Sequence, residues 1–318
     1  MNEHGQDPAA HRPPVHWEHI PRDESERLRE LAHDGGVIAE EPSIDDHDDG
    51  PPRTAWQHLK WPLILFVATC ATTYLTGGLA YSAAVVTILL CHEFGHYIQA
   101  RRYRVPASLP YFIPMPISPL GTMGAVIGMS GRIPNRKALF DIGISGPLAG
   151  LGPALLATWV GLQWSTHAPM ENFRGGGLFF NEPLIFDWMA YLRFGPLPET
   201  EVIQAHPLAI AGWAGLFVTA LNLIPIGQLD GGHILYAMLR KWSYPITTLL
   251  LYGTLAAMVF TGNYGWSLMV MLLLLSGPNH PPTHNDAEPL GWGRTILGWV
   301  TLSFIIVGFT PVPITIAP

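Results

Sequence analysis

Residues 79–101 read LAYSAAVVTILLCHEFGHYIQAR, an apolar run that contains His92, Glu93 and His96. Side chains four residues apart on a helix project from one face, so the two histidines can hold one metal ion. Glu93 lies beside them and can act as a general base on water. Ionisable side chains are costly inside a bilayer and usually serve a function there. The stretch therefore predicts a metal site within a membrane-spanning helix.

The composition is that of a membrane protein with a polar tail. Of the 318 residues, 48% are hydrophobic and only 13% are charged, and the mean hydropathy is +0.24. Residues 1–60 hold 14 of the 24 acidic residues but only 6 of the 17 basic ones. We expect residues 1–56 to form a disordered acidic cytoplasmic tail and residues 57–318 to form a membrane domain. The chain lacks a basic patch of the kind that binds nucleic acid.

Apolar segments follow the tail at 61–75, 79–100, 138–163, 207–239, 244–261, 264–275 and 292–309. Most approach the roughly 20 residues that cross about 30 Å of hydrocarbon, whereas the sixth segment is short. We therefore expect an all-α polytopic membrane protein with six to seven transmembrane helices. Basic residues flank the segments so that one topology places them all in the cytoplasm with the N-terminus. The expected location is the inner membrane of a bacterial cell.

Residues 105–134, between the second and third segments, are apolar but interrupted by prolines and glycines. Both ends lie beside basic residues, so we expect the segment to dip into the membrane and return as a loop or β-hairpin. Irregular backbone survives at that depth only where it packs on protein or lines a wet cavity. Two roles remain open: the segment can offer an edge strand to an extended substrate, or it can simply seal the helix bundle.

A catalytic zinc ion needs a third protein ligand and an open position for water. The candidates are the other ionisable residues in apolar segments: Asp141, Asp230 and His233. Asp230 follows a proline and a glycine that interrupt its helix, and broken helices inside membranes commonly build ion sites. Asp141 lies four residues after Lys137, so an ion pair or a helix N-terminal position explains it equally well. For His233 a hydrogen-bonded packing role is favoured over a role beside the metal.

HEFGH at 92–96 and NLIPIGQLDG at 222–231 together resemble the two motifs of the site-2 proteases, which are intramembrane zinc metalloproteases. The similarity covers about residues 79–240, which we take as the catalytic core. Residues 133–141 are most similar to the cyanobacterial and plastid branch of the family. Many members carry a PDZ domain after the third span, but residues 165–206 are too few for one. The chain therefore resembles a branch without PDZ.

The resemblance implies one catalytic zinc ion, with His92, His96 and Asp230 as its ligands and Glu93 as the base. It also implies that Asn222 lies near the scissile carbonyl and helps to hold the substrate or the oxyanion. The spacing alone leaves another role open for this amide, which is to cap backbone groups freed by the helix break.

These features predict a zinc metalloendopeptidase that hydrolyses peptide bonds of membrane-spanning substrates within or near the bilayer. The expected partners are a membrane protein or transmembrane peptide as substrate, and the lipid bilayer. One alternative is a metal-ion transporter with His92, His96 and Asp230 as a transit site, and Glu93, placed as a base, argues against it. Another is an inactive relative that binds membrane helices, which the intact ligand set and base disfavour.

Overall fold

The computed structural model describes residues 55–129, 133–173, 178–198, 200–262, 266–277 and 280–316. By its contacts the chain divides into residues 1–52 and residues 53–318, and every described residue belongs to the second unit. Nearly all of the predicted acidic tail, residues 1–56, therefore lies outside the described residues.

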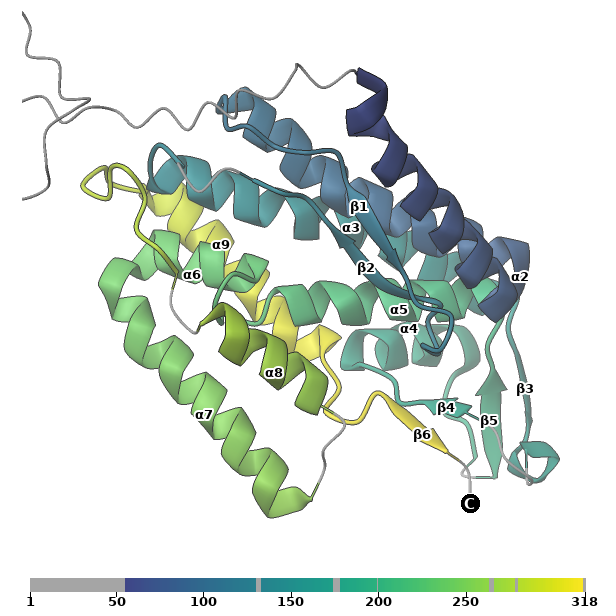
Figure 1. The fold of residues 1–318 in the computed structure, drawn as a ribbon. Coiled ribbons are helices and arrows are strands. Elements are labelled where there is room, and N and C mark those ends of the chain that lie inside the picture. Colours follow the sequence, from purple (N-terminus) through teal and green to yellow (C-terminus); the bar gives the residue numbers. More distant parts are fainter. Residues whose placement is uncertain are drawn as a thin grey trace, which may run out of the picture. The chain divides into compact units, whose positions relative to one another are not determined.

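The described unit is mostly helical, with three small two-stranded antiparallel sheets (Figure 1). The helices are α2 (Ala55–Arg102), α3 (Arg136–Gln163), α4 (Leu184–Phe194), α5 (Pro207–Asn222), α6 (Asp230–Leu239), α7 (Ser243–Thr261), α8 (Ser267–Ser276) and α9 (Trp292–Gly308), with single 3₁₀ turns η1 (Met170–Phe173) and η2 (Arg240–Trp242). The strands are β1 (Tyr111–Pro114), β2 (Thr122–Val126), β3 (Thr166–Pro169), β4 (Leu178–Phe180), β5 (Glu201–Gln204) and β6 (Ile314–Ile316).

Three helical stretches of the described residues are long and apolar enough to cross a membrane: Leu59–Arg102, Arg136–Gln163 and Asp230–Thr261. The predicted helical membrane class is therefore confirmed in its coarse form, although the prediction of six to seven spans goes beyond these three. The purely helical class was also too narrow, because two of the sheets, β3–β5 and β4–β6, were not expected.

Helix α2 reverses direction at Gly78, whose φ of 76° lies in the left-handed region that favours glycine. The Ser82 hydroxyl donates to the carbonyl oxygen of Cys70 at 3.1 Å and lies 2.8 Å from the Thr73 hydroxyl. Twelve residues of straight helix would separate Cys70 from Ser82 by about 18 Å, so the chain must fold back between them. The first two predicted apolar segments form the two arms of this hairpin (Figure 1).

Of the loop or β-hairpin expected between α2 and α3, the structure has the hairpin. β1 pairs with β2 in antiparallel fashion, with Tyr111 opposite Val126. The Phe112 ring is buried and meets Phe66 of the first α2 arm edge to face, with 5.2 Å between ring centroids. The Tyr81 hydroxyl donates to the carbonyl oxygen of Leu120 at 3.0 Å, at the turn of the hairpin. The hairpin is therefore fixed against both arms of α2.

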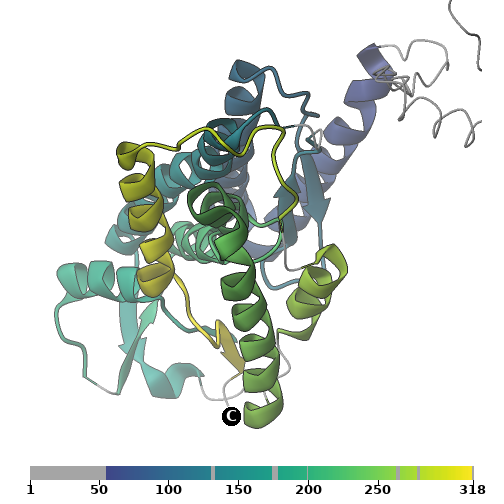
Figure 2. The same cartoon turned by 90° about the vertical axis from the view of Figure 1, so that its left-hand side faces the viewer.

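Helix α3 lies at the centre of the unit and packs against α2, α5 and α6. Its buried residues Phe140, Leu139 and Ile144 join a cluster with Ile234 and Leu235 of α6. At the opposite end, Leu162 of α3 joins a second buried cluster with residues of α4 and α5. Figure 2 shows the connection from α8 to α9 crossing above this helical packing. We call residues 280–286 of that connection the strap.

Candidate metal centre

Two elements distant in sequence bring the predicted metal ligands together. His92, Glu93 and His96 lie on the second arm of α2, and each is 5% exposed. Asp230 is the first residue of α6, which follows an interruption after Asn222, the last residue of α5. The interrupted helix predicted from the sequence is therefore present, and its second half presents the carboxylate to α2.

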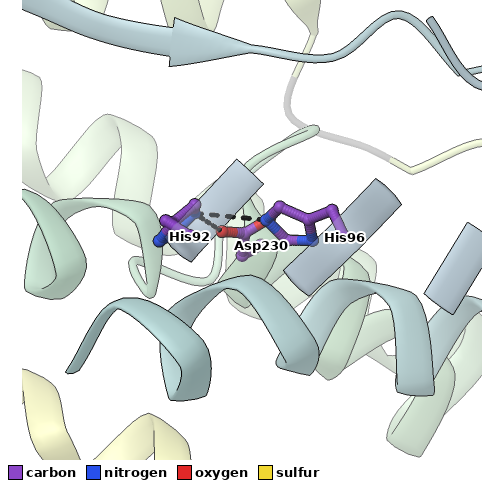
Figure 3. A group of neighbouring side chains, drawn as sticks. All are labelled: His92, His96 and Asp230. Carbon is purple, nitrogen blue, oxygen red and sulfur yellow. Dashed lines mark hydrogen bonds and ion pairs between the residues drawn. The ribbon is translucent and has the colours of Figure 1, made fainter. Parts of the chain in front are cut away.

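The donor atoms of His92, His96 and Asp230 converge, as Figure 3 shows. The Nε2 atoms of the two histidines lie 3.2 Å apart. Oδ2 of Asp230 lies 3.2 Å from His92 Nε2, and Oδ1 lies 3.3 Å from His96 Nε2. Tetrahedral ligands at about 2.0–2.1 Å from zinc are separated by about 3.3 Å, so these donor atoms fit a zinc ion in both type and spacing.

The tautomer of His96 also suits a ligand. Its Nδ1 lies 2.8 Å from the carbonyl oxygen of Ile142 on α3. Because a carbonyl only accepts hydrogen bonds, Nδ1 carries the proton, and the lone pair of Nε2 faces the other two donors. Hydrogen bonds of this kind from the outer ring nitrogen commonly orient metal-binding histidines.

Two glycines of α3 make room for the histidine rings. A Cβ atom added at Gly146 would lie 2.0 Å from His96 Nε2, and one added at Gly150 would lie 3.1 Å from His92 Cβ. Two small residues at the spacing of Gly146-x-x-x-Gly150 permit close packing against a helix. In the structure the two glycines pack α3 against the imidazole rings of His92 and His96, so they are part of the metal centre.

Glu93 and Asn222 line the same cavity as the three donors, and its volume is about 300 Å³. The Asn222 Nδ2 atom lies 3.3 Å from His92 Nε2, so the amide reaches the metal donors. The structure thus brings all five predicted site residues together: His92, Glu93, His96, Asn222 and Asp230.

Residues 125–127 and Met129 also line the cavity, and they belong to the segment for which a place beside an extended substrate was one of the two open roles. Sequence reasoning missed Gln228 of the helix break and residues 280–283 of the strap, which complete this part of the wall. The only local signal for the strap was a histidine followed by two prolines after a run of apolar residues, which does not predict where it packs.

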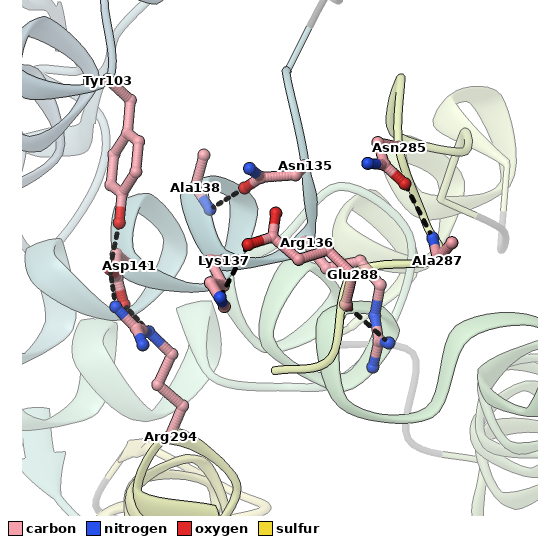
Figure 4. Close-up of polar contacts among 10 residues, drawn as sticks. All are labelled: Tyr103, Asn135, Arg136, Lys137, Ala138, Asp141, Asn285, Ala287, Glu288 and Arg294. Carbon is pink, nitrogen blue, oxygen red and sulfur yellow. Dashed lines mark hydrogen bonds and ion pairs between the residues drawn. The ribbon is translucent and has the colours of Figure 1, made fainter. Parts of the chain in front are cut away.

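Asp141 does not belong to this cavity, and the suggested pairing with Lys137 is wrong. Two atoms of the Arg294 guanidinium donate to the Asp141 carboxylate at 2.8 Å each, and the Tyr103 hydroxyl donates to it as well (Figure 4). Lys137 instead pairs with Glu288 at 2.7 Å. Asp141 therefore joins the start of α3 to α9.

His233 lines the metal cavity, and at one ring nitrogen it lacks the hydrogen bond that the favoured packing role implied. Its Nδ1 atom is buried and finds no hydrogen-bond partner among the described residues. Its ring meets that of His280 edge to face, with 4.7 Å between centroids.

Comparisons with known proteins agree with this site. The chain is 30% identical over 242 residues to the probable zinc metalloprotease EGY1, chloroplastic, of Arabidopsis thaliana, which covers 75% of this chain and 44% of that protein. It is 32% identical over 259 residues to the protein of the same name from Oryza sativa subsp. japonica, covering 76% and 42%. The probable zinc metalloprotease EGY3, chloroplastic, of Oryza sativa subsp. indica is 29% identical, covering 71% and 41%. The chain thus spans less than half the length of these curated relatives.

The expected location in a bacterial inner membrane is contradicted by these relatives. All three are named as chloroplastic plant proteins. The physical reason for the error is that hydropathy and basic flanks report that a segment crosses a membrane but do not distinguish one membrane from another.

The family model of peptidase family M50 matches residues 80–260, which include both sequence motifs and every residue of the donor set. This is the family of the site-2 proteases, so the resemblance noted in the sequence is confirmed. The chain belongs to peptidase family M50.

Proposed function

We propose that this chain is a zinc metalloprotease that hydrolyses peptide bonds of membrane-spanning substrates within or near the bilayer. The observation that carries the proposal is the convergence of His92, His96 and Asp230 in one cavity with Glu93, at the junction of apolar helices. The names of the relatives, probable zinc metalloproteases of the chloroplast, support both the chemistry and a plastid membrane.

In this proposal each side chain has one role. His92, His96 and Asp230 hold the zinc ion, which when bound supplies Lewis-acid polarisation of the scissile carbonyl and of water. Glu93 takes a proton from the attacking water and gives it to the nitrogen of the leaving amine. Asn222 directs its Nδ2 atom to the site and donates a hydrogen bond to the scissile carbonyl or oxyanion.

The substrate reaches the site as an extended strand. A helical peptide bond is shielded by its own backbone, so a transmembrane substrate must unwind before hydrolysis. Among the described residues β2 pairs with β1 alone, and the chain from Ala125 onward lines the metal cavity. An unwound segment can therefore pair with the free edge of β2 and lie next to Glu93.

We further propose six complete membrane crossings and a short seventh. The 44 residues of Leu59–Arg102 extend about 66 Å as helix, twice the hydrocarbon thickness, so the reversal at Gly78 supplies two crossings. Helices α3, α5, α7 and α9 supply one each, and the 10-residue α8 is the short one. The pairing of β6 with β4 supports this number of crossings. β4 follows α3 and β6 follows α9, so in this arrangement the ends of both helices lie on the same side of the membrane. Residues 57–318 then form the protease domain around a core of about 79–240, and residues 1–56 form its polar tail.

The experiment that tests the activity compares the purified chain with its Glu93→Gln variant. We expect the wild type to cleave a transmembrane peptide and the variant to lose cleavage while it retains one zinc ion per chain. Glu288→Gln is the matched control, because Glu288 is a partly exposed carboxylate that pairs with Lys137 away from the cavity. Full cleavage by the Glu93 variant would reject the mechanism. Zinc flux into sealed vesicles without peptidase activity would instead favour a transporter.

A further inference from the structure

The strap forms a wall of the metal cavity and is fixed in place by polar contacts. The backbone amides of His284 and Asn285 donate to the carbonyl oxygens of Ile133 and Pro134, both at 3.0 Å. These bonds attach the strap to the segment that leads into α3, so its position relative to α2 and α6 is set by the fold.

A carboxylate anchors the strap to α6. Asp286 accepts hydrogen bonds at 2.6 Å from the hydroxyl of Tyr236 on α6 and from that of Thr283 within the strap. Burial by itself raises the pKa of Asp286, but these donors outweigh it and hold the pKa below its ordinary value. The ionised carboxylate thus ties the strap to the helix that carries Asp230.

The ring of His280 is held within this wall. It is 7% exposed and lies 5.0 Å from the ring of Tyr236 and 4.7 Å from that of His233, measured between centroids. Its Nδ1 donates to the carbonyl oxygen of Pro281. The proton on Nδ1 leaves Nε2 with a lone pair that can accept a hydrogen bond.

His233, its neighbour, has the buried Nδ1 atom that lacks a partner in the described part of the chain. Buried polar atoms without partners are rare in native structures and call for an explanation. Neither histidine belongs to the group of metal donors, yet both line the cavity that those donors enter. A ligand that occupies the cavity can supply the missing partner.

We propose that His233 and His280 form a binding subsite for the main chain of an extended peptide, next to the scissile bond. A peptide group offers both an N–H donor and a C=O acceptor, so it complements a ring nitrogen in either protonation form. A strand paired with β2 would pass between the hairpin segment and the strap, which lie on the same cavity. This subsite rests on the proposed protease function, since it assigns the peptide that the cavity receives.

The test measures binding without cleavage, in the Glu93→Gln background. The probe is a fluorescein-labelled synthetic transmembrane peptide of Leu and Ala with a central Gly-Pro interruption, added to the full chain in liposomes, and Kd is read from fluorescence anisotropy. His280→Phe keeps a ring against Tyr236 and His233 but removes both ring nitrogens. His280→Gln keeps an acceptor. His284→Ala is the matched control, because His284 is exposed on the same strap and does not line the cavity.

We expect His280→Phe to raise Kd about tenfold, as the loss of one hydrogen bond at a desolvated site implies, and His280→Gln to recover most of that loss. His284→Ala should bind like the parent, and zinc content should be the same in every variant. His233→Leu, which removes the unpartnered Nδ1 on another element, should weaken binding to a similar degree and keeps the proposal testable if a strap variant misfolds.

Three results would overturn the subsite: unchanged Kd in His280→Phe, equal losses in His280→Phe and His284→Ala, or no binding of the peptide to the Glu93→Gln parent. Failure of the proposed function has a different signature. If the wild-type chain never cuts the peptide while His280→Phe still weakens its binding, the subsite stands and the protease activity does not.

Discussion

Two cavities of this molecule each contain an enclosed carboxyl group, and the side chains around that group are of opposite kinds. Asp230, with a side chain 14% exposed, faces the imidazoles of His92 and His96. Glu182 lies in a cavity of about 610 Å³ between the segments that follow α3, and it shares a hydrogen bond with the carboxyl of Asp187. Burial first, and then the hydrogen bond and charge of Asp187, raise the pKa of Glu182 to about 8.

The difference shows what decides the chemistry of an enclosed acid. Nitrogen lone pairs around Asp230 create a place for a cation, whereas a second carboxyl beside Glu182 favours a shared proton. An acidic residue in an apolar sequence therefore predicts a special site, but its neighbours in space determine whether a metal or a proton fills it. The following predictions test this contrast, from the largest expected effect to the smallest.

Removing the metal-side carboxylate should have the largest effect. Asp230→Ala should reduce bound zinc from one ion per chain to near zero and lower kcat/KM at least about a thousandfold, which corresponds to about 4 kcal/mol of transition-state stabilisation. Zinc is measured by atomic absorption and cleavage by a peptide assay. Glu182→Gln, the counterpart in the other cavity, should retain both. Equal losses of bound zinc and of cleavage in the two variants would contradict the difference between the two cavities.

Adding one methyl group beside the metal donors should have the next largest effect. Gly146→Ala would place a Cβ 2.0 Å from His96 Nε2, so the ring must move and the donor set opens. We expect zinc affinity to fall about 10–100-fold, as for other changes that misorient a ligand. Chelator competition measures this affinity. Gly152→Ala, on the same helix, is the control, because a Cβ atom at this position would meet nothing within 4 Å. A similar loss of zinc affinity in this variant would contradict the prediction.

The charge of a third enclosed carboxylate, Asp141, is balanced by the guanidinium of Arg294. Breaking this ion pair should lower the stability of the fold without changing zinc binding. Arg294→Met leaves Asp141 without its bidentate partner, and we expect a loss of about 1–2 kcal/mol in the free energy of unfolding, because the pair is only partly buried. Denaturant unfolding in micelles measures the loss, with zinc content unchanged. Lys137→Met breaks the more exposed pair with Glu288 and should cost less than about 1 kcal/mol. A reversed order of these two losses would show that burial does not govern them.

The smallest effect should be a pH dependence of stability from Glu182. Its pKa is raised in the folded state, so the folded chain binds more protons and the stabilising contribution is complete below about pH 4.5. That contribution is lost as the pH rises through about 8. Thermal melting between pH 6 and 9 should therefore show a decline in the wild type that is weaker in Glu182→Gln. A parallel decline in both would assign the titration to another group.

The elements of the metal centre were predictable because their signals are local: two histidines at helical spacing, and a proline–glycine break before Asp230. That they meet across 138 residues was implied by the resemblance to the site-2 proteases and not by a local pattern. The β1–β2 hairpin was one of the two forms expected for residues 105–134, and its strands are separated by only seven residues of sequence. In contrast, Arg294 lies 153 residues from Asp141, and no local pattern links them. The strands β4 and β6 have three residues each and pair over a separation of 134 to 138 residues, so neither shows a periodicity that predicts it.

The position of the reversal at Gly78 has a consequence for biosynthesis. The α2 hairpin is complete once residue 102 has been made, and it then carries two metal donors and the base. Asp230 follows His92 by 138 residues. At about 5–20 residues per second, translation needs roughly 7–28 s to reach it. During that interval the nascent chain holds the two imidazoles without Asp230, so the three-ligand site is complete only after α6 has joined α2.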